Sequence, residues 1–245
     1  MRILTILPIV ILFPMLMMTK SVISQSACPG TATITYGGMT YNTVQIGTQC
    51  WMKENLNVGT RINVIQDQTN NQTIEKYCYN DLESNCDIYG GLYQWNEMMQ
   101  YVTTPGTKGV CPPGWHIPTS GEWSSSSTLL GGTSVAGGKM KETGYSHWST
   151  PNTGASNTSG FTALGGGFRT GTPQTKELLI SGYFASSTLA TSTNIWFVYL
   201  GYNMNDFSLL NSLFMNNGLS VRCLKDPGSS TATPTVTTTE ATNIS

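Results

Sequence analysis

Charged side chains are scarce in this 245-residue chain, where they make up 10% of the residues. A typical globular protein carries about 25%. The sequence contains no basic run and no aromatic residue set within a basic patch, so it offers no electrostatic interface for nucleic acid. Asparagine, threonine, serine and glycine take the place of the missing charges. This polar but uncharged composition is typical of an extracellular protein.

The short motifs of common enzyme classes are also missing. No GxSxG, HExxH or phosphate-binding glycine loop occurs, and the glycines at 165–167 precede Phe168 and Arg169 rather than the Lys-Ser/Thr of a P-loop. Glycan hydrolysis would need two carboxylates roughly 5–5.5 or 6.5–9.5 Å apart. The acidic residues are scattered, and none lies in a glycosidase motif. We therefore expect a protein that is not an enzyme.

Residues 1–24 are interpreted as a signal peptide. Arg2 supplies a positive charge, and the apolar run after it is interrupted by Pro8 and Pro14. A stable membrane-spanning helix needs roughly 20 predominantly apolar residues, so a retained anchor helix is the less favoured alternative. A small residue precedes Gln25, which suits cleavage at that point. Cleavage would remove two basic and no acidic side chains, leaving 10 basic and 13 acidic ones and a net charge of −3.

One domain is predicted over residues 25–226, because tryptophans, cysteines and alternating apolar residues continue without an obvious linker. Residues 227–245 are rich in threonine and serine, with Val236 and Ile244 as their larger apolar residues. Such a tail buries too little surface to offset its ordering entropy, so we predict that it is disordered. A stalk, a glycosylated linker and a truncated sorting segment are alternatives.

Short strands dominate the periodicity of the domain. Alternating or apolar segments bounded by turn residues predict strands at 33–36, 43–46, 49–52, 194–200 and 219–224. Long stretches rich in glycine, serine, threonine and asparagine, at 131–160 and 165–182, are expected to be irregular.

Two helices are predicted. In the first, over 91–101, Leu92, Trp95 and Met99 share one face at spacings of three and four. The second covers 120–130, where Thr119 and a glutamate three residues later resemble a capping box.

All six cysteines follow the predicted signal peptide. An even cysteine count in an exported chain indicates a disulfide framework. The alternative is a metal site or a catalytic thiol, but no CxxC pair exists and only His116 and His147 could add imidazole ligands. A tetrahedral zinc site would need closer spacing of its ligands. We therefore expect structural disulfides.

A series of motifs follows in order along the domain: TVQIGTQCWMKENL (43–56), CYNDLESNCDIYGGLYQW (78–95), GVCPPGWHIPTSGEW (109–123), AGGKMKETG (136–144), SGFTALGGGFR (159–169), GYFASST (182–188) and GLSVRCLKD (218–226). In this series the chain resembles the Fibrobacter succinogenes major paralogous domain. That family occurs in secreted and surface proteins of Bacteroidetes and related bacteria. The resemblance covers nearly all of the predicted domain.

The resemblance implies an α+β, C-type lectin-like fold, with short antiparallel sheets, two helices and long irregular loops held by disulfides. The formylglycine-generating enzymes share that fold, so it does not by itself define an activity. The expected disulfides are Cys78–Cys86 across a short polar loop, Cys28–Cys50 around the first strands, and, from the lectin-like habit of closing the domain with a long-range bridge, Cys111–Cys223.

The six tryptophans suggest a surface that stacks on sugar rings, but most have apolar surroundings. Core positions are predicted for Trp51, Trp95, Trp115, Trp123 and Trp196. Trp148 lies in a polar loop beside Tyr145 and His147. These last three residues are the predicted ligand-binding group, with Trp148 as its exposed aromatic ring.

Calcium is the cofactor that the resemblance makes possible, because lectin-like domains often bind it through loop oxygens. Asn203, Asn205 and Asp206 could supply such oxygens, although these residue types are also common in turns. The EPN or QPD tripeptide of sugar-binding C-type lectins is missing. No other cofactor is expected.

Taken together, these features predict an exported, disulfide-stabilised binding or adhesion domain, secreted or at the cell surface. Its partner would be an extracellular glycan or protein, bound by the loops at 131–160 and 165–190 on a rigid scaffold. The first alternative is an enzyme of the formylglycine-generating type, which needs a reduced cysteine pair. The second is a purely structural component of the cell envelope.

Overall fold

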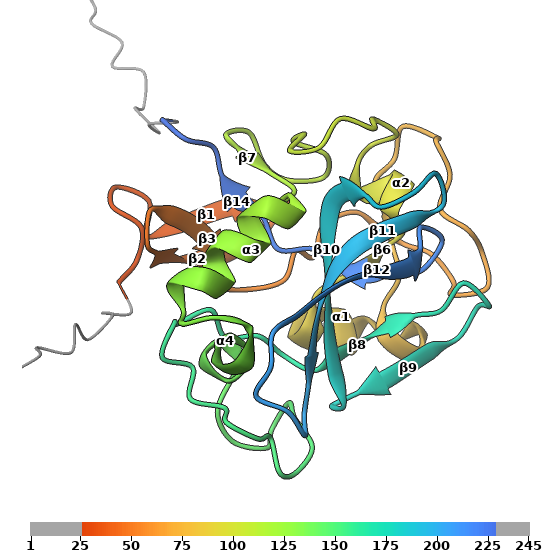
Figure 1. Cartoon of the computed structure of the whole chain (residues 1–245). Coiled ribbons are helices and arrows are strands. Elements are labelled where there is room, and N and C mark those ends of the chain that lie inside the picture. The colour runs from red at the N-terminus through yellow and green to blue at the C-terminus, as the bar shows by residue number, and fades with distance from the viewer. Residues whose placement is uncertain (1–25, 229–245) are drawn as a thin grey trace, which may run out of the picture.

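An antiparallel meander begins the described part of the chain, which is residues 26–228 of the computed structural model (Figure 1). It consists of β1 (Thr33–Tyr36), β2 (Met39–Ile46) and β3 (Gln49–Met52). β14 (Leu224–Lys225) pairs with β3, and β7 (Trp115–His116) pairs with β14. Strands from the start, middle and end of the domain therefore share one five-stranded sheet. The predicted signal peptide, and the predicted tail beyond residue 228, lie outside the described residues.

A second, seven-stranded sheet contains the long central strands of the molecule. Its main path runs through β12 (Ser208–Phe214), β11 (Asn194–Gly201), β10 (Ser181–Leu189), β13 (Leu219–Ser220) and β6 (Leu92–Tyr93). Two further strands, β8 (Gly166–Arg169) and β9 (Thr175–Leu178), pair with each other and join this sheet through β10. A separate pair of short parallel strands is formed by β4 (Thr60–Arg61) and β5 (Glu75–Lys76).

Four α-helices and one short 3-10 helix, η1 (Tyr79–Asp81), complete the described residues: α1 (Glu83–Tyr89), α2 (Trp95–Met98), α3 (Ser120–Leu129) and α4 (Thr133–Met140). In Figure 1, α3 lies between the meander and the central strands, with α4 below it. None of the described helices is long and apolar enough to cross a membrane.

The local patterns predicted part of this architecture correctly. The strands predicted at 33–36, 43–46, 49–52 and 194–200 are confirmed, as is the second helix. That helix begins with the predicted capping box, in which Thr119 accepts from the Glu122 backbone and the Glu122 carboxylate accepts from the Thr119 backbone.

Two predicted elements are wrong, each for a tertiary reason, and the predicted number of helices is too low. The helix over 91–101 is instead β6 followed by the four-residue α2, because Leu92 and Tyr93 pair with β13. The strand over 219–224 is divided, since β13 and β14 belong to different sheets and residues 221–223 cross between them. The expected count of two helices is too low, because the described residues also form α1 and α4.

The stretches predicted to be irregular contain α4, β8, β9 and the start of β10. Their glycines serve close packing rather than flexibility. A Cβ atom at Gly137 would collide with the Asp206 backbone, and one at Gly138 with the Asn205 side chain. A glycine-rich composition therefore marks a place where two chain segments touch.

All six cysteines are paired: Cys28–Cys50, Cys78–Cys86 and Cys111–Cys223. These are the three expected pairs. The third joins the segment before β7 to the crossover between the sheets, over a sequence separation of 112 residues.

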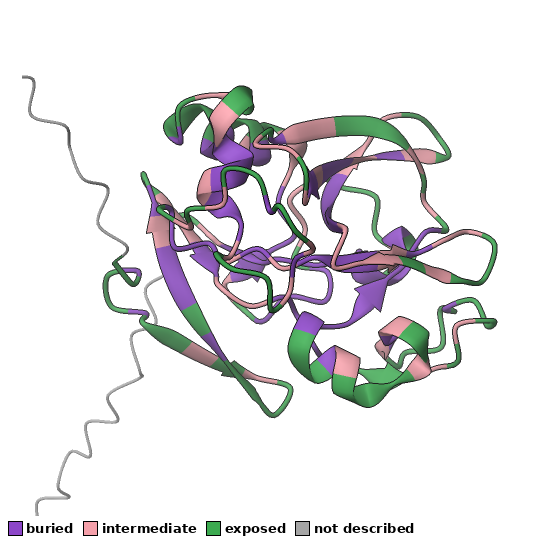
Figure 2. Ribbon diagram, turned by 90° about the horizontal axis from the view of Figure 1, so that it is seen from below, coloured by how far each residue is buried: buried purple, intermediate pink, exposed green. Residues whose placement is uncertain are grey.

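The core is rich in aromatic rings, and Figure 2 shows buried strands inside a more exposed periphery. The Trp51 and Trp123 rings lie 4.5 Å apart, and both contact the Phe161 ring. Five tryptophans are at most 1% exposed, including four of the five predicted core positions. The exception is Trp196, which is half-buried because it alternates with the inward-facing Ile195 and Phe197 on β11.

Buried basic side chains fix the loops between these elements. Three backbone carbonyls accept hydrogen bonds from the Lys141 ammonium, those of Thr153 at 3.0 Å, Gly201 at 2.9 Å and Met204 at 2.8 Å. Burial lowers the pKa of Lys141 to about 8, which leaves the ammonium protonated at neutral pH. The guanidinium of Arg169 likewise donates hydrogen bonds to the carbonyls of Val64, Gln66 and Asn216.

Replacing Lys141 by methionine tests this role. The Lys141→Met variant would leave three carbonyls without their donor, and we expect it to lose about 1–3 kcal/mol of unfolding free energy. Lys139→Met is the matched control, because Lys139 is half-buried and binds one carbonyl, that of Leu130. Urea unfolding of both variants measures the difference. Equal losses of unfolding free energy in the two variants would show that the three Lys141 hydrogen bonds stabilise the fold no more than the single Lys139 hydrogen bond.

The disulfides are expected to differ in their contribution to stability. In the chain-entropy account, the Cys111–Cys223 bridge closes a long loop and stabilises by about 5 kcal/mol, against about 3 kcal/mol for Cys78–Cys86. Double alanine variants of each pair, compared by denaturant unfolding, check this order. A larger loss from removing the local bridge would contradict the loop-length explanation.

Candidate functional site

A cavity of about 230 Å³ opens where the meander meets α1 and the segment at 162–164. Its lining includes Lys53, Glu54 and Asn55 after β3, Asp87 on α1, Glu142 after α4, and Arg222 in the crossover between the two sheets. We call it the Arg222 cavity. Segments that are distant in the sequence meet there, and the lining carries charges of both signs.

The Arg222 side chain is 1% exposed, and its hydrogen bonds are unevenly distributed. Nε donates to Asn55 Oδ1 at 3.0 Å. Nη1 donates to the Met52 and Phe161 carbonyls at 3.1 and 2.7 Å. A guanidinium has five N–H groups, so these bonds leave both N–H groups of Nη2 without an acceptor among the described residues.

The charge of Arg222 also lacks a direct partner, since no salt bridge joins it to a described carboxylate. Its guanidinium carbon lies 4.1 Å from the centroid of the Phe161 ring, a cation–π contact. Burial lowers the pKa of Arg222 to about 9, and the nearby Glu54 carboxylate offsets part of that effect. The cavity therefore contains a cation that stays charged at neutral pH and has two donors to spare.

Carboxylates line the same cavity as this donor. Glu54 is held by Asn42, whose backbone N–H and side-chain amide donate to it at 2.7 and 2.8 Å. Glu142 holds His147 through its Oε2 atom, 2.7 Å from Nδ1. Since only one oxygen of Glu142 is engaged there, the other can accept from a ligand. Lys53 adds a second cation, and its ammonium forms no salt bridge with the described residues.

The structure separates the three residues predicted to bind a ligand. Tyr145 is 62% exposed, whereas His147 is half-buried and reaches the Arg222 cavity only through Glu142. The prediction that Trp148 is an exposed ring is wrong, because its side chain is 0% exposed. Its indole N–H donates to the Ala163 carbonyl at 2.9 Å, and its ring lies 5.4 Å from the Lys141 ammonium. Trp148 is thus a core residue within a polar loop.

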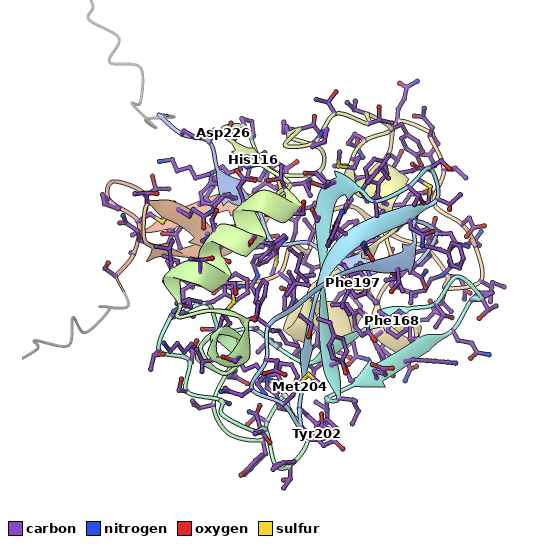
Figure 3. The ribbon with its side chains drawn as sticks, viewed as in Figure 1. His116, Phe168, Phe197, Tyr202, Met204 and Asp226 are labelled. Atoms are coloured by element: carbon purple, nitrogen blue, oxygen red, sulfur yellow. A yellow bond between two sulfur atoms is a disulfide. The ribbon has the colours of Figure 1, made fainter. Side chains whose placement is uncertain are left out.

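The residues predicted to bind calcium lie on the loop after β11, where Figure 3 labels Tyr202 and Met204. The Asn205 amide donates to the Ser134 carbonyl at 3.2 Å, while Asn203 and Asp206 are exposed. Carbonyls of this loop bind Lys141, so it already has a cationic partner. The calcium prediction rests on the sequence alone.

One group of three possible metal ligands occurs among the described residues, namely Cys78, Glu83 and Cys86. Both of its sulfur atoms belong to the Cys78–Cys86 disulfide. A thiolate is the form of cysteine that binds metal, so this group has a structural role in the oxidised protein.

His116 forms a second polar cluster, which the sequence analysis did not identify. Its Nδ1 lies 2.7 Å from Asp226 Oδ1 and its Nε2 lies 3.0 Å from Glu122 Oε1. The cluster joins β7, α3 and the end of the domain, and Figure 3 labels His116 and Asp226 at this place. Glu122 is already the capping residue of α3. We interpret the cluster as a clasp for the C-terminal strand.

The clasp makes stability depend on pH. Burial alone would lower the pKa of His116, but the hydrogen bonds to Glu122 and Asp226 outweigh burial and raise it. Because the pKa of His116 is higher in the folded state than in the unfolded state, its protonation stabilises the folded protein. This stabilisation is fully present below about pH 6.5, the ordinary histidine value, and is lost as pH rises through the folded pKa. We expect a loss of about 1 kcal/mol, typical of a partly exposed ion pair.

Urea unfolding of the protein and of a His116→Gln variant, between pH 5.5 and about 8.5, measures this pH-dependent stabilisation. The difference in unfolding free energy between the two proteins should shrink as pH rises. Parallel pH profiles would show that His116 is not protonated in the clasp.

Comparison with known proteins identifies the family. The family model described as the Fibrobacter succinogenes major domain matches residues 44–225, which is more than half of the chain. No curated protein and no solved structure matches this chain. The matched range contains most of the lining of the Arg222 cavity, His116 and Glu122 of the His116 cluster, and two of the three disulfides in full. The chain belongs to the Fibrobacter succinogenes major domain family.

Proposed function

We propose that this protein is an exported, non-catalytic binding domain of a secreted or surface protein, with an extracellular glycan as its ligand. The observation that carries the proposal is the Arg222 cavity, where a buried guanidinium retains two free N–H groups. These N–H groups are donors that no described acceptor uses. A ligand oxygen in the cavity would accept hydrogen bonds from them.

Two features support export. Three disulfides persist in an oxidising compartment and are rare in the cytosol. The sequence of residues 1–24 fits a cleaved signal peptide, and the low charge of the chain suits an extracellular surface.

We also propose kinship with the C-type lectin-like fold. A strand of the first meander, β3, pairs with the last strand, β14, and the long-range Cys111–Cys223 bridge closes the domain near that pairing. The mixture of short sheets, few helices and long loops also resembles the C-type lectin-like fold. On such a scaffold, binding groups are supplied by loops and crossovers, which is where Lys53, Glu142 and Arg222 lie.

The thiol-dependent alternative has less support. A formylglycine-generating enzyme needs a reduced cysteine pair, and all six cysteines of this chain are in disulfides. The carboxylates that line the Arg222 cavity are better explained as acceptors for the hydroxyl groups of a ligand.

A glycan array with the mature protein tests the proposal, with cavity access as the variable. Ile88 lines the Arg222 cavity from α1 and is 49% exposed, so an Ile88→Trp substitution narrows the site without entering the core. Leu129→Trp on α3 is the matched control, since Leu129 is 48% exposed and lies outside the cavity. We expect the first variant to weaken glycan binding by about tenfold or more, equivalent to about 1.4 kcal/mol, and the control to bind normally.

Two results would count against this function. A silent array, together with no retention of cell-wall polysaccharide by the immobilised protein, would remove the evidence for a glycan ligand. Equal binding by the two tryptophan variants would place recognition somewhere other than the Arg222 cavity.

A further inference from the structure

We propose that the Arg222 cavity recognises a carboxylate-bearing sugar, a hexuronic acid residue of a glycan, and binds it with the carboxylate directed at Arg222 and Lys53. This inference rests on the proposed glycan-binding function and adds the chemical class of the ligand.

The first argument is the direction of the free donors. Arg222 uses Nε and Nη1 on protein acceptors, which leaves the Nη2 donors for another group. Because Arg222 is 1% exposed yet lines the cavity, these donors are available only there. Lys53 lines the same cavity, and its ammonium forms no salt bridge with the described residues. Two cations without salt bridges in one cavity favour an anion, since charge-assisted hydrogen bonds are about twice as strong as neutral ones.

The second argument is the distribution of acceptors. Glu54, Asp87 and Glu142 line the cavity as well, so a ligand with several negative charges would be repelled. Hydroxyl groups, in contrast, donate short hydrogen bonds to carboxylates. The suitable ligand has one anionic group for the cations and several hydroxyl groups for the acids. A sugar acid has this combination on a single ring.

The third argument is size. At about 230 Å³, the cavity is smaller than the roughly 300–1,000 Å³ of pockets for drug-sized ligands. It therefore suits one ring-sized residue rather than an extended peptide segment. A peptide carboxyl terminus would satisfy the cations, but its side chains and backbone would leave most of the acidic acceptors unpaired.

The test uses small probes that differ in one group. NMR titration of the mature protein compares methyl glucuronide with methyl glucoside, which lacks the carboxylate. We expect the glucuronide to bind at least about tenfold more tightly, as the loss of a charge-assisted hydrogen bond implies. In protein labelled with ¹⁵N in arginine, the Arg222 guanidinium resonance should shift with the glucuronide and not with the glucoside.

A charge reversal separates the cavity from the overall charge of the protein. Lys53→Glu replaces a cation of the cavity lining by an acid and should weaken glucuronide binding by about tenfold or more. Lys176→Glu is the matched control, because Lys176 is exposed on β9, outside the Arg222 cavity, and the change in net charge is the same. Arg222→Lys, with its folding checked by thermal unfolding, should lose the preference for the glucuronide over the glucoside.

Several results would overturn the inference. Equal affinity for the two sugars, or equal effects of Lys53→Glu and Lys176→Glu, would show that no carboxylate is recognised in the cavity. Tighter binding of acetyl-glycylglycine than of the glucuronide would assign the site to peptide carboxyl termini. If the array shows binding of neutral glycans that Ile88→Trp weakens, the proposed function stands and the uronic acid assignment fails. If neither the array nor the titration detects binding, both fail.

Discussion

Hydrogen bonds from buried cations to backbone carbonyls hold the loops of this domain together. Loop segments lack the regular ladders that satisfy backbone groups in helices and sheets, yet buried carbonyls need donors. Lys141, Arg169 and Arg222 supply them, each to carbonyls from at least two separate segments. Charged donors form the stronger bonds, and one side chain can bind several carbonyls at once. A chain with only 12 lysines and arginines thus uses three of them as buried donors to backbone carbonyls.

The crossover between the two sheets shows how this constraint creates the candidate site. Residues 221–223 leave β13 and enter β14, and they bring Arg222 and Cys223 into the interior. Cys223 is tied to Cys111, while Arg222 ties the end of the meander to Phe161. The guanidinium must be buried for this task, but the surrounding acceptors engage only Nε and Nη1. The structural role of Arg222 therefore leaves part of the same side chain open to a ligand.

Polar loops in this protein are buried to an extent that their composition conceals. Trp148 lies among polar and small residues in the sequence, yet it belongs to the same hydrophobic cluster as Trp51 and Trp123. The glycines of α4 permit the loop after β11 to approach the helix closely. Lys141 follows directly and binds the carbonyls of Gly201, the last residue of β11, and of Met204 in that loop. Composition, which usually separates surface from core, fails where loops pack on one another.

The sequence by itself determined the features that depend on neighbouring residues. The capping box of α3 needs only Thr119 and Glu122, the first strands follow from alternation and glycine turns, and the family follows from ordered motifs. The Cys78–Cys86 bridge follows from a short separation, whereas the other disulfides were inferred with the help of the resemblance.

Tertiary structure alone decided the conformation of segments whose partners are far away in the chain. Leu92 has helical spacing with Trp95 and Met99, but it pairs with Ser220 on β13, 128 residues later. The clasp joins His116 to Asp226 across 110 residues, and the Arg222 cavity combines segments from Met39 at one end of the lining to Arg222 at the other. Local periodicity contains no information about such contacts, because it records which face of an element is apolar and not what covers it.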